Sequence, residues 1–339
     1  MSERAVWIDG PGRLAVRQVE RATAGAGEVL VRVAWAGICA SDREVLRGSR
    51  PSGFVSYPVI PGHEWSGTVE EIGAGVDPTL LDQPVVGEGF RSCRVCAACR
   101  RGDTNLCDGP YDETGFTRAG AWSDHLVVPA GLLHPLPPGA DLRAAAVLEP
   151  AACAAAACLR ASPTPGMRIA VVGAGTLGLL ATQLLAASGP AELVAVDPRA
   201  AHAELAAACG ATGYINPDEA AGPSWQQRFD VVIEAAGVSG SAALATALAA
   251  RGGQVVLTGL AALDERPLLA IDLVLRELTV RTVFGAPSRA WTHAVRAFTA
   301  GLLDPTLLVA HEVPLDEVER AFELLEDAEG KGTKVLLKP

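Results

Sequence analysis

A glycine-rich segment between an apolar run and a helical pattern constrains the fold of this chain more than any other feature. The run Arg168–Val172 leads into GAGTLG at positions 173–178, and a helix-like segment follows. In a strand–turn–helix context, the first glycine permits the tight turn, the second lets the backbone approach a pyrophosphate, and the third allows close helix–strand packing. The helix N-terminus adds free N–H groups and a positive dipole end. The cofactor-binding residues expected here are Gly173, Gly175, Thr176, Leu177 and Gly178.

An acidic residue after the next strand-like run, Asp197, bears on the choice between NAD and NADP. The run Leu193–Val196 ends at Asp197. A carboxylate at this place accepts hydrogen bonds from the adenosine ribose hydroxyls and repels a 2′-phosphate, so NAD is favoured over NADP. Arg199 keeps NADP open, because a nearby arginine can accommodate that phosphate. The alternative, an α/β domain that binds nothing, leaves the placement of the acid unexplained.

The rhythm of strand and helix signals changes near Pro150 and divides the chain. Before it, short β-like runs separated by Gly and Pro predict a β-rich module; these are Glu28–Trp35, Gly67–Ile72 and His125–Val128. From Arg168, near-continuous apolar strands alternate with helices, including one over Ser241–Ala250, which is typical of a buried parallel sheet. The last part predicts helices over Ser288–Gly301 and Leu315–Gly330 and a strand over Lys334–Lys338. A length of 339 residues fits two such domains.

Four cysteines lie close together in the β-rich part. Cys93, Cys96, Cys99 and Cys107 have the pattern CxxCxxCx7C. Thiolates at this spacing can surround one tetrahedral zinc ion and leave no position for substrate, which predicts a structural zinc site. Disulfides are disfavoured because the chain shows no secretory signal and is expected to be cytoplasmic. An iron–sulfur cluster is the alternative use of four thiolates.

A second metal site is suggested by residue types that are far apart in the sequence. Cys39 follows a strand, His63 and Glu64 follow a Pro/Gly-rich loop, and Glu149 lies where the rhythm changes. A catalytic zinc needs about three protein ligands and one open position. Each residue also has an ordinary explanation, as a buried thiol, a surface imidazole or a solvated acid, so the residues alone leave this site undecided.

Taken in order, the motifs resemble the zinc-containing medium-chain alcohol and polyol dehydrogenases. The matching stretches are GICASD, GHEWSGTVEEIGAGV, the four-cysteine loop, VVGAGTLG and the C-terminal KGTKVLLKP. The similarity covers essentially the whole chain and is greatest to the sorbitol and threonine dehydrogenase branch. SYPVIPGHEWSG and GFTRAGAWSDHLVVP also resemble dehydrogenases that act on aminocyclitols.

This resemblance implies a domain arrangement and a reaction. It implies a GroES-like β-rich catalytic domain over residues 1–150 and 286–339, and a Rossmann NAD-binding domain over 151–285. The implied reaction is zinc-dependent oxidation of a secondary alcohol of a polyol, cyclitol or amino alcohol, with hydride transfer to NAD. Two zinc ions per chain are implied. A zinc-free quinone or enone reductase and a non-catalytic dinucleotide-binding protein are the alternatives, and the retained cysteines and His63 disfavour both.

The resemblance also implies roles for residues around the catalytic zinc. Cys39 and His63 would be ligands, and Glu64 and Glu149 would be permanent or exchangeable ligands. Ser41 would take the hydroxyl proton, and Asp42 would support a ligand. Many relatives have a proton-relaying histidine where this chain has Glu44, which leaves relay, substrate contact and a solvated acid open. Cys153 and Cys158 match no ligand position.

Further cofactor contacts and the partners follow from the same resemblance. Thr258, Leu260 and Phe284 would approach the nicotinamide, and Lys334 the pyrophosphate. Relatives form dimers or tetramers, and Leu273–Val283 would suit that contact as a sheet edge. The loop Arg47–Tyr57 is where substrate specificity is expected. A formal net charge of −11 argues against nucleic acid and anionic membranes as partners, which leaves a small-molecule alcohol.

Overall fold

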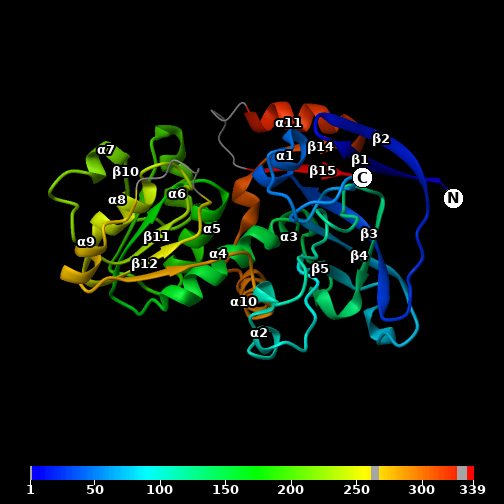
Figure 1. The fold of residues 1–339 in the computed structure, drawn as a ribbon, viewed down its shortest axis with the longest axis horizontal. Coiled ribbons are helices and arrows are strands. Elements are labelled where there is room, and N and C mark those ends of the chain that lie inside the picture. The colour runs from blue at the N-terminus through cyan, green and yellow to red at the C-terminus, as the bar shows by residue number, and fades with distance from the viewer. Residues whose placement is uncertain (1, 261–266, 327–333) are drawn as a thin grey trace.

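The structure, a computed structural model, describes residues 2–260, 267–326 and 334–339 and has two parts. Figure 1 shows a sheet with covering helices in green and yellow on the left, and a β-rich part in blue and cyan on the right. The C-terminal strands, in red and orange, lie among the blue strands, so the chain returns to the part where it began. None of the described helices combines the length and apolar character needed to cross a bilayer.

The β-rich part contains a seven-stranded sheet and a separate hairpin. The sheet order is β14-β15-β3-β4-β5-β7, with β6 also paired to β3. Its strands are β3 (Glu28–Gly37), β4 (Trp65–Ile72), β5 (Pro84–Gly87), β6 (His125–Pro129), β7 (Leu133–Pro135), β14 (Val309–Pro314) and β15 (Lys334–Lys338). The hairpin is β1 (Ser2–Gly10) with β2 (Arg13–Glu20). The three expected N-terminal runs form β3, β4 and β6, and the expected final strand forms β15.

The second part is a parallel sheet of six strands with helices on its faces. The strands are β8 (Arg168–Val172), β9 (Glu192–Val196), β10 (Gly213–Ile215), β11 (Phe229–Glu234), β12 (Ala249–Leu257) and β13 (Thr279–Thr282). Their spatial order, β10-β9-β8-β11-β12-β13, is the doubly wound order 3-2-1-4-5-6. The order reverses between β8 and β11, and ligands of such sheets bind at the carboxyl ends of the strands at this point. The predicted fold class is confirmed.

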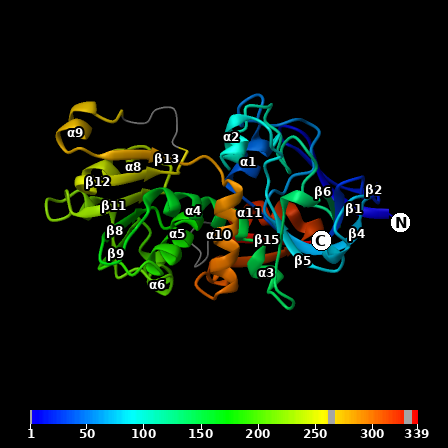
Figure 2. The same cartoon turned by 90° about the horizontal axis from the view of Figure 1, so that it is seen from below.

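Eleven α-helices complete the described part of the chain. Their bounds are α1 (Ala40–Arg47), α2 (Ala97–Arg100), α3 (Leu142–Ala145), α4 (Leu148–Ala161), α5 (Thr176–Ala186), α6 (Ala203–Ala208), α7 (Pro217–Ala220), α8 (Ser241–Leu248), α9 (Ala270–Leu275), α10 (Ser288–Thr299) and α11 (Val318–Glu326). Figures 1 and 2 place α4 and α10 between the two sheets. The alanines of α4 are buried against α5 and α10, because a side chain of one carbon lets helix axes approach closely.

Helix boundaries depart from the expected ranges in three places, and the smallest departure is α10, which ends at Thr299 and not at Gly301. The helix expected over Ser241–Ala250 ends at Leu248, because Ala249 has extended backbone and pairs with Phe229 of β11. Alanine favours helix weakly, and the sheet ladder overrides that preference. The segment expected as one helix over Leu315–Gly330 begins with a 3-10 turn before α11. Its last residues, 327–330, lie outside the described part, as do Lys331, Gly332 and Thr333 of the KGTKVLLKP motif.

Candidate metal and cofactor sites

The first candidate ligand, Cys39, stands at the N-terminal end of α1, directly after β3. Its backbone N–H donates to Oδ2 of Asp42 at 2.8 Å, so the acid on the first turn fixes the start of the helix. Asp42 is fully buried, and its Oδ1 lies 3.5 Å from Nδ1 of His63. Burial alone would lower the pKa of His63, but the neighbouring Asp42 carboxylate raises it well above the usual value. Asp42 therefore orients the imidazole and leaves Nε2 for another partner.

His63 and Glu64 are brought to Cys39 by the pairing of β3 with β4. Ala36 is paired with Trp65, and the N–H of Gly37 donates to the Glu64 carbonyl at 2.9 Å. The loop before His63 is held by backbone bonds to Gly120, Ala121 and Trp122. The His63 ring packs against the Phe116 ring at a tilt of 36°, with centroids 4.7 Å apart. Two segments distant in sequence therefore meet where β3 ends and β4 begins.

These residues form a compact and chemically mixed donor set. One ligand atom from each of Cys39, His63 and Glu64 lies within 4.8 Å of the others. A thiolate, an imidazole and a carboxylate are donors that zinc accepts, and three protein donors leave a fourth position open. The buried Nδ1 of His63 has no hydrogen-bond partner within the described residues, only the nearby Asp42 carboxylate. This set fits a catalytic-type zinc ion.

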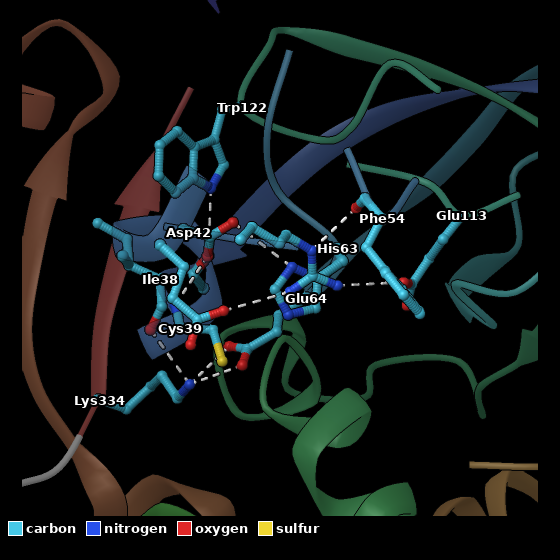
Figure 3. A network of polar contacts seen from close by, with 12 residues as sticks. Ile38, Cys39, Asp42, Phe54, His63, Glu64, Glu113, Trp122 and Lys334 are labelled. Atoms are coloured by element: carbon cyan, nitrogen blue, oxygen red, sulfur yellow. Dashed lines mark hydrogen bonds and ion pairs between the residues drawn. The ribbon is translucent and has the colours of Figure 1, made fainter. Parts of the chain in front are cut away.

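Lys334 neutralises one member of that set. Its Nζ donates to both carboxylate oxygens of Glu64 at 2.7 Å and to the Ile38 carbonyl at 3.2 Å, as Figure 3 shows. Lys334 is only 3% exposed and Glu64 is fully buried. The ammonium thus forms a buried ion pair beside the metal ligands, and its expected contact with a cofactor pyrophosphate stays a prediction. Burial would lower the pKa of Lys334, but Glu64 raises it above its usual value.

Glu149, the other candidate acid, is not one of the three clustered donors. It stands at the start of α4 and accepts a long hydrogen bond from the Cys153 thiol, at 3.5 Å. Burial raises the pKa of Glu149. At rest, the geometry places Glu64 with Cys39 and His63, and leaves Glu149 on the wall of the adjoining cavity.

One cavity of about 630 Å³ connects the candidate zinc ligands with the parallel sheet. The predicted site residues that line it are Cys39, Ser41, Glu44, His63, Glu64, Glu149, Gly175, Thr176, Leu177, Arg199, Thr258, Leu260, Phe284 and Lys334. Gly173, Gly178 and Asp197 lie outside the lining. The structure thus brings the two predicted sites together in one space between the domains, which the sequence could not show.

The outer glycines of the loop are required by close backbone packing. Gly173 has φ +101°, and a Cβ there would lie 2.7 Å from the nitrogen of Ala236 on the neighbouring crossover. A Cβ on Gly178 would lie 1.7 Å from the carbonyl oxygen of Gly173. Gly175 is the N-cap of α5 and lines the cavity. The helix N-terminus therefore opens toward the cavity, as phosphate binding requires.

Asp197 is already engaged by its neighbour Arg199. The guanidinium Nε and Nη2 donate to the two carboxylate oxygens at 2.9 and 2.8 Å, and the N–H of Ala174 also donates to Asp197. Burial would raise the pKa of Asp197, but its bonds with Arg199 lower it. Arg199 is thus paired with Asp197, and of these two residues it is Arg199 that lines the cavity.

The four cysteines of the loop are gathered as the spacing predicts. One sulfur from each of Cys93, Cys96, Cys99 and Cys107 lies within 4.8 Å of the others. Backbone N–H groups of Val95 and Cys96 lower the pKa of Cys93, and those of Cys93 and Gly109 lower that of Cys107. Four clustered sulfurs with thiolate-stabilising amides fit a closed tetrahedral zinc site.

Three residues on the far wall of the cavity were not anticipated. Arg50, Tyr111 and Glu113 line it together with Phe90 and Phe116. Burial raises the pKa of the Glu113 carboxyl to about 8. None of these residues belongs to a motif with a characteristic spacing, so the sequence carried no signal for them beyond the placement of Arg50 in the expected specificity loop.

Comparisons with known proteins agree with this geometry. Residues 25–138 match the alcohol dehydrogenase GroES-like domain, and residues 176–300 match the zinc-binding dehydrogenase domain. D-xylulose reductase A of Aspergillus niger is 31% identical over 91% of this chain and 89% of its own length. A structure described as a zinc-binding dehydrogenase from Sinorhizobium meliloti, bound to NADP, has a TM-score of 0.93 at 30% identity, with both chains fully covered. A cobalt- and zinc-bound thermostable alcohol dehydrogenase from Pyrobaculum aerophilum has a TM-score of 0.90 at 32% identity, also with full coverage of both.

Proposed function

The chain belongs to the zinc-containing medium-chain alcohol and polyol dehydrogenase family, and we propose that it oxidises a secondary alcohol of a polyol, cyclitol or amino alcohol to a ketone. NAD is the proposed hydride acceptor. The observation that carries the proposal is the single cavity, which has the donors Cys39, His63 and Glu64 at one end and the glycine loop at the other. Substrate and nicotinamide would meet between these ends.

The residues of the cavity divide into holding, orienting and proton-handling groups. Zinc, when bound, supplies a Lewis acid that lowers the pKa of a coordinated hydroxyl. Cys39, His63 and Glu64 would hold it, and Asp42 orients His63 through the 3.5 Å contact. Ser41 lies on the cavity wall and would accept the hydroxyl proton. Glu149 would be the exchangeable ligand, since it lines the same cavity.

Glu44 has a contact that favours a structural over a relay role. Its carboxylate lies 3.6 Å from Arg50, although Glu44 also lines the cavity. A proton relay requires a carboxylate directed at the substrate hydroxyl, whereas the printed contact of Glu44 is with the guanidinium of Arg50. We therefore propose that Glu44 supports Arg50. A pH–rate profile that shifts in Glu44→Gln would restore the relay role.

NAD is proposed over NADP on the burial of Asp197, although the Sinorhizobium meliloti relative binds NADP. Arg199 is held by two hydrogen bonds to Asp197 and would have to leave it to reach a 2′-phosphate. The ratio of kcat/KM for NAD to that for NADP measures this preference. We expect Asp197→Asn to lower that ratio about tenfold, because the repulsion of the phosphate is removed. If Asp197→Asn leaves this ratio unchanged, residues other than Asp197 discriminate between NAD and NADP.

The domain division and the oligomer are part of the same proposal. Domains of residues 1–150 with 286–339, and 151–285, are supported by β14 and β15 joining the sheet of β3. Homodimers or homotetramers are supported by β13, which is an end strand of the parallel sheet. Beside it, α9 exposes Ile271, Val274 and Leu275 by 64–72%. Sedimentation of the wild type and of Val274→Glu tests this contact, and a monomeric wild type would dismiss it.

The alternatives fit the cavity less well. A zinc-free quinone or enone reductase would have no use for three converging donors, and a non-catalytic protein would have no use for an open fourth position. The test is NADH formation by zinc-replete protein over a panel of polyols, cyclitols and amino alcohols, including 2-deoxy-scyllo-inosamine. Turnover abolished by a chelator and restored by zinc is the expected result. Quinone reduction that continues in the presence of the chelator would favour the zinc-free reductase. NAD binding without turnover of any alcohol would favour the non-catalytic protein.

A further inference from the structure

The far wall of the cavity carries a carboxyl group that the proposed reaction does not use. Glu113 is 5% exposed and lines the cavity that contains Cys39 and His63. Figure 3 shows it on the other side of His63 from Cys39 and Lys334. Its backbone is fixed by a bridge to Phe90 and by a hydrogen bond from its N–H to the Thr117 hydroxyl at 2.8 Å. The carboxyl is therefore held across the substrate space from the metal ligands.

Only one oxygen of this carboxyl is used by the protein. The Tyr111 hydroxyl donates to Oε2 of Glu113. Within the described residues, Oε1 has no hydrogen-bond partner. This oxygen is not one of the fully buried unpaired atoms of the described residues, so it remains accessible to a donor from outside the protein. Since Glu113 lines the cavity, a bound molecule can supply it.

The neighbouring arginine is held by other groups. Arg50 donates to the Phe54 carbonyl and to the Tyr111 hydroxyl, each at 2.9 Å, and its guanidinium lies 3.8 Å from the centroid of the Phe116 ring. Its Nη2 is 4.0 Å from Oε2 of Glu113, too long for a hydrogen bond, and its Nη1 is 3.6 Å from Glu44. Arg50 thus orders Tyr111 and leaves Oε1 of Glu113 without a donor from the described residues.

The nearest cation to Glu113 is shared with a second acid. Lys334 is paired with Glu64, and Arg50 is shared between Glu44 and Glu113. One guanidinium therefore faces two carboxylates, that of Glu113 among them, while Arg43 also lines the cavity. An ammonium group near Oε1 would supply a second positive charge and N–H donors to that oxygen.

We propose that Glu113 is a specificity-determining residue that binds the protonated amine of an amino alcohol substrate while the alcohol lies at the Cys39–His63–Glu64 site. This inference rests on the proposed function and narrows it from polyols, cyclitols and amino alcohols to the last class. Arg50 and Tyr111 act as positioning residues for the carboxyl. Burial keeps the Glu113 charge costly in the free enzyme, so the substrate cation itself stabilises the ionised form.

The test compares two ligands that differ in one group, scyllo-inosamine and scyllo-inositol, on zinc-loaded enzyme with NAD. We expect wild type to bind and oxidise the inosamine at least tenfold better. Glu113→Gln keeps the size and the acceptor for Tyr111, and should lower kcat/KM and affinity for the inosamine roughly 10- to 100-fold. Both values for scyllo-inositol should stay within about threefold. Glu113→Asp, which keeps the charge, should recover part of the preference.

The controls separate this inference from the proposed function. Glu20→Gln, at an exposed carboxyl on β2, makes the same chemical change away from the cavity and should leave the preference intact. Calorimetric binding is measured beside turnover, with zinc content and melting temperature of each variant. The inference is overturned if wild type binds neither ligand, shows no preference for the amine, or loses both ligands equally in Glu113→Gln. The proposed function fails separately, if no alcohol of any class gives chelator-sensitive NADH.

Discussion

The four-cysteine loop and the Cys39–His63–Glu64 cluster are both donor sets suited to zinc, but they are built in opposite ways. The loop takes four identical donors from fifteen residues of chain, and Cys93 is exposed. The cluster has three different donors, one from the turn between β3 and α1 and two from the residues just before β4, and two of them, His63 and Glu64, are buried. It also borders a cavity of about 630 Å³.

The first set has enough donors to fill the coordination sphere of a zinc ion, whereas the second leaves one coordination position for substrate. A local set of four thiolates fills the coordination sphere, so its contribution is to the fold. A mixed set of three leaves room for substrate and requires the surrounding fold to orient its members, as Asp42 and Lys334 do here. Removing ligands from the two sites should therefore have different consequences.

The largest expected effect comes from the open site. His63→Ala removes a ligand and should lower kcat/KM about 10⁴-fold, because the Lewis acid is lost or misplaced. The melting temperature should change by only a few degrees. Activity assays with metal analysis check this, and the zinc content should fall from two per chain to one. Retention of more than a tenth of the activity would contradict a catalytic role for this cluster.

The second effect concerns the closed site. Cys107→Ser should also remove one zinc per chain, but it should lower the melting temperature by about 10 °C, because structural zinc contributes to folding directly. Below that temperature, activity per zinc-loaded catalytic site should remain within a few-fold. Calorimetric melting with a kinetic assay at 20 °C measures both. If Cys107→Ser abolished activity in folded protein, the contrast between the two sites would be lost.

A third variant tests the ion pair that distinguishes the open site. Lys334→Met leaves the buried Glu64 carboxylate without its cation, which should destabilise metal-free protein by about 3 kcal/mol. Zinc should then bind more tightly, because it no longer competes with the ammonium for Glu64. Denaturant unfolding and zinc titration of apo protein provide the measurement. Lys338→Met, at a more exposed lysine, is the control.

The smallest expected effect is the pH dependence of stability. Burial raises the pKa of Glu113 from 4.5 to about 8 in the folded protein. The unfolded state keeps the lower value, so the protonated folded form is favoured below pH 4.5 and that stability is lost as the pH rises toward 8. Relative to wild type, Glu113→Gln should gain a few degrees of melting temperature between pH 5 and 9. A difference that is constant with pH would contradict the raised pKa.

The sequence predicted the fold and the residues at both the metal and the cofactor part of the cavity, but less than half of its lining. The glycine loop and the strands around it have strong local signals, and the doubly wound order followed. The ends of helices were less certain, since Ala249 belongs to a strand through its pairing with Phe229. The ion pair of Lys334 with Glu64 was not predicted, because the two residues lie 270 positions apart in the sequence.

The sequence by itself determined what depends on neighbouring residues: the turn at Gly173–Gly178, the acid at Asp197 and the four sulfurs of one loop. Only the tertiary structure decided that Glu64 lies with Cys39 and His63. It also decided the ion pairs of Lys334 with Glu64 and of Arg199 with Asp197. It also placed Glu113 opposite the metal ligands. The physical reason is that spacing fixes local geometry, whereas the direction of a buried side chain is set by packing and strand pairing between segments far apart in the chain.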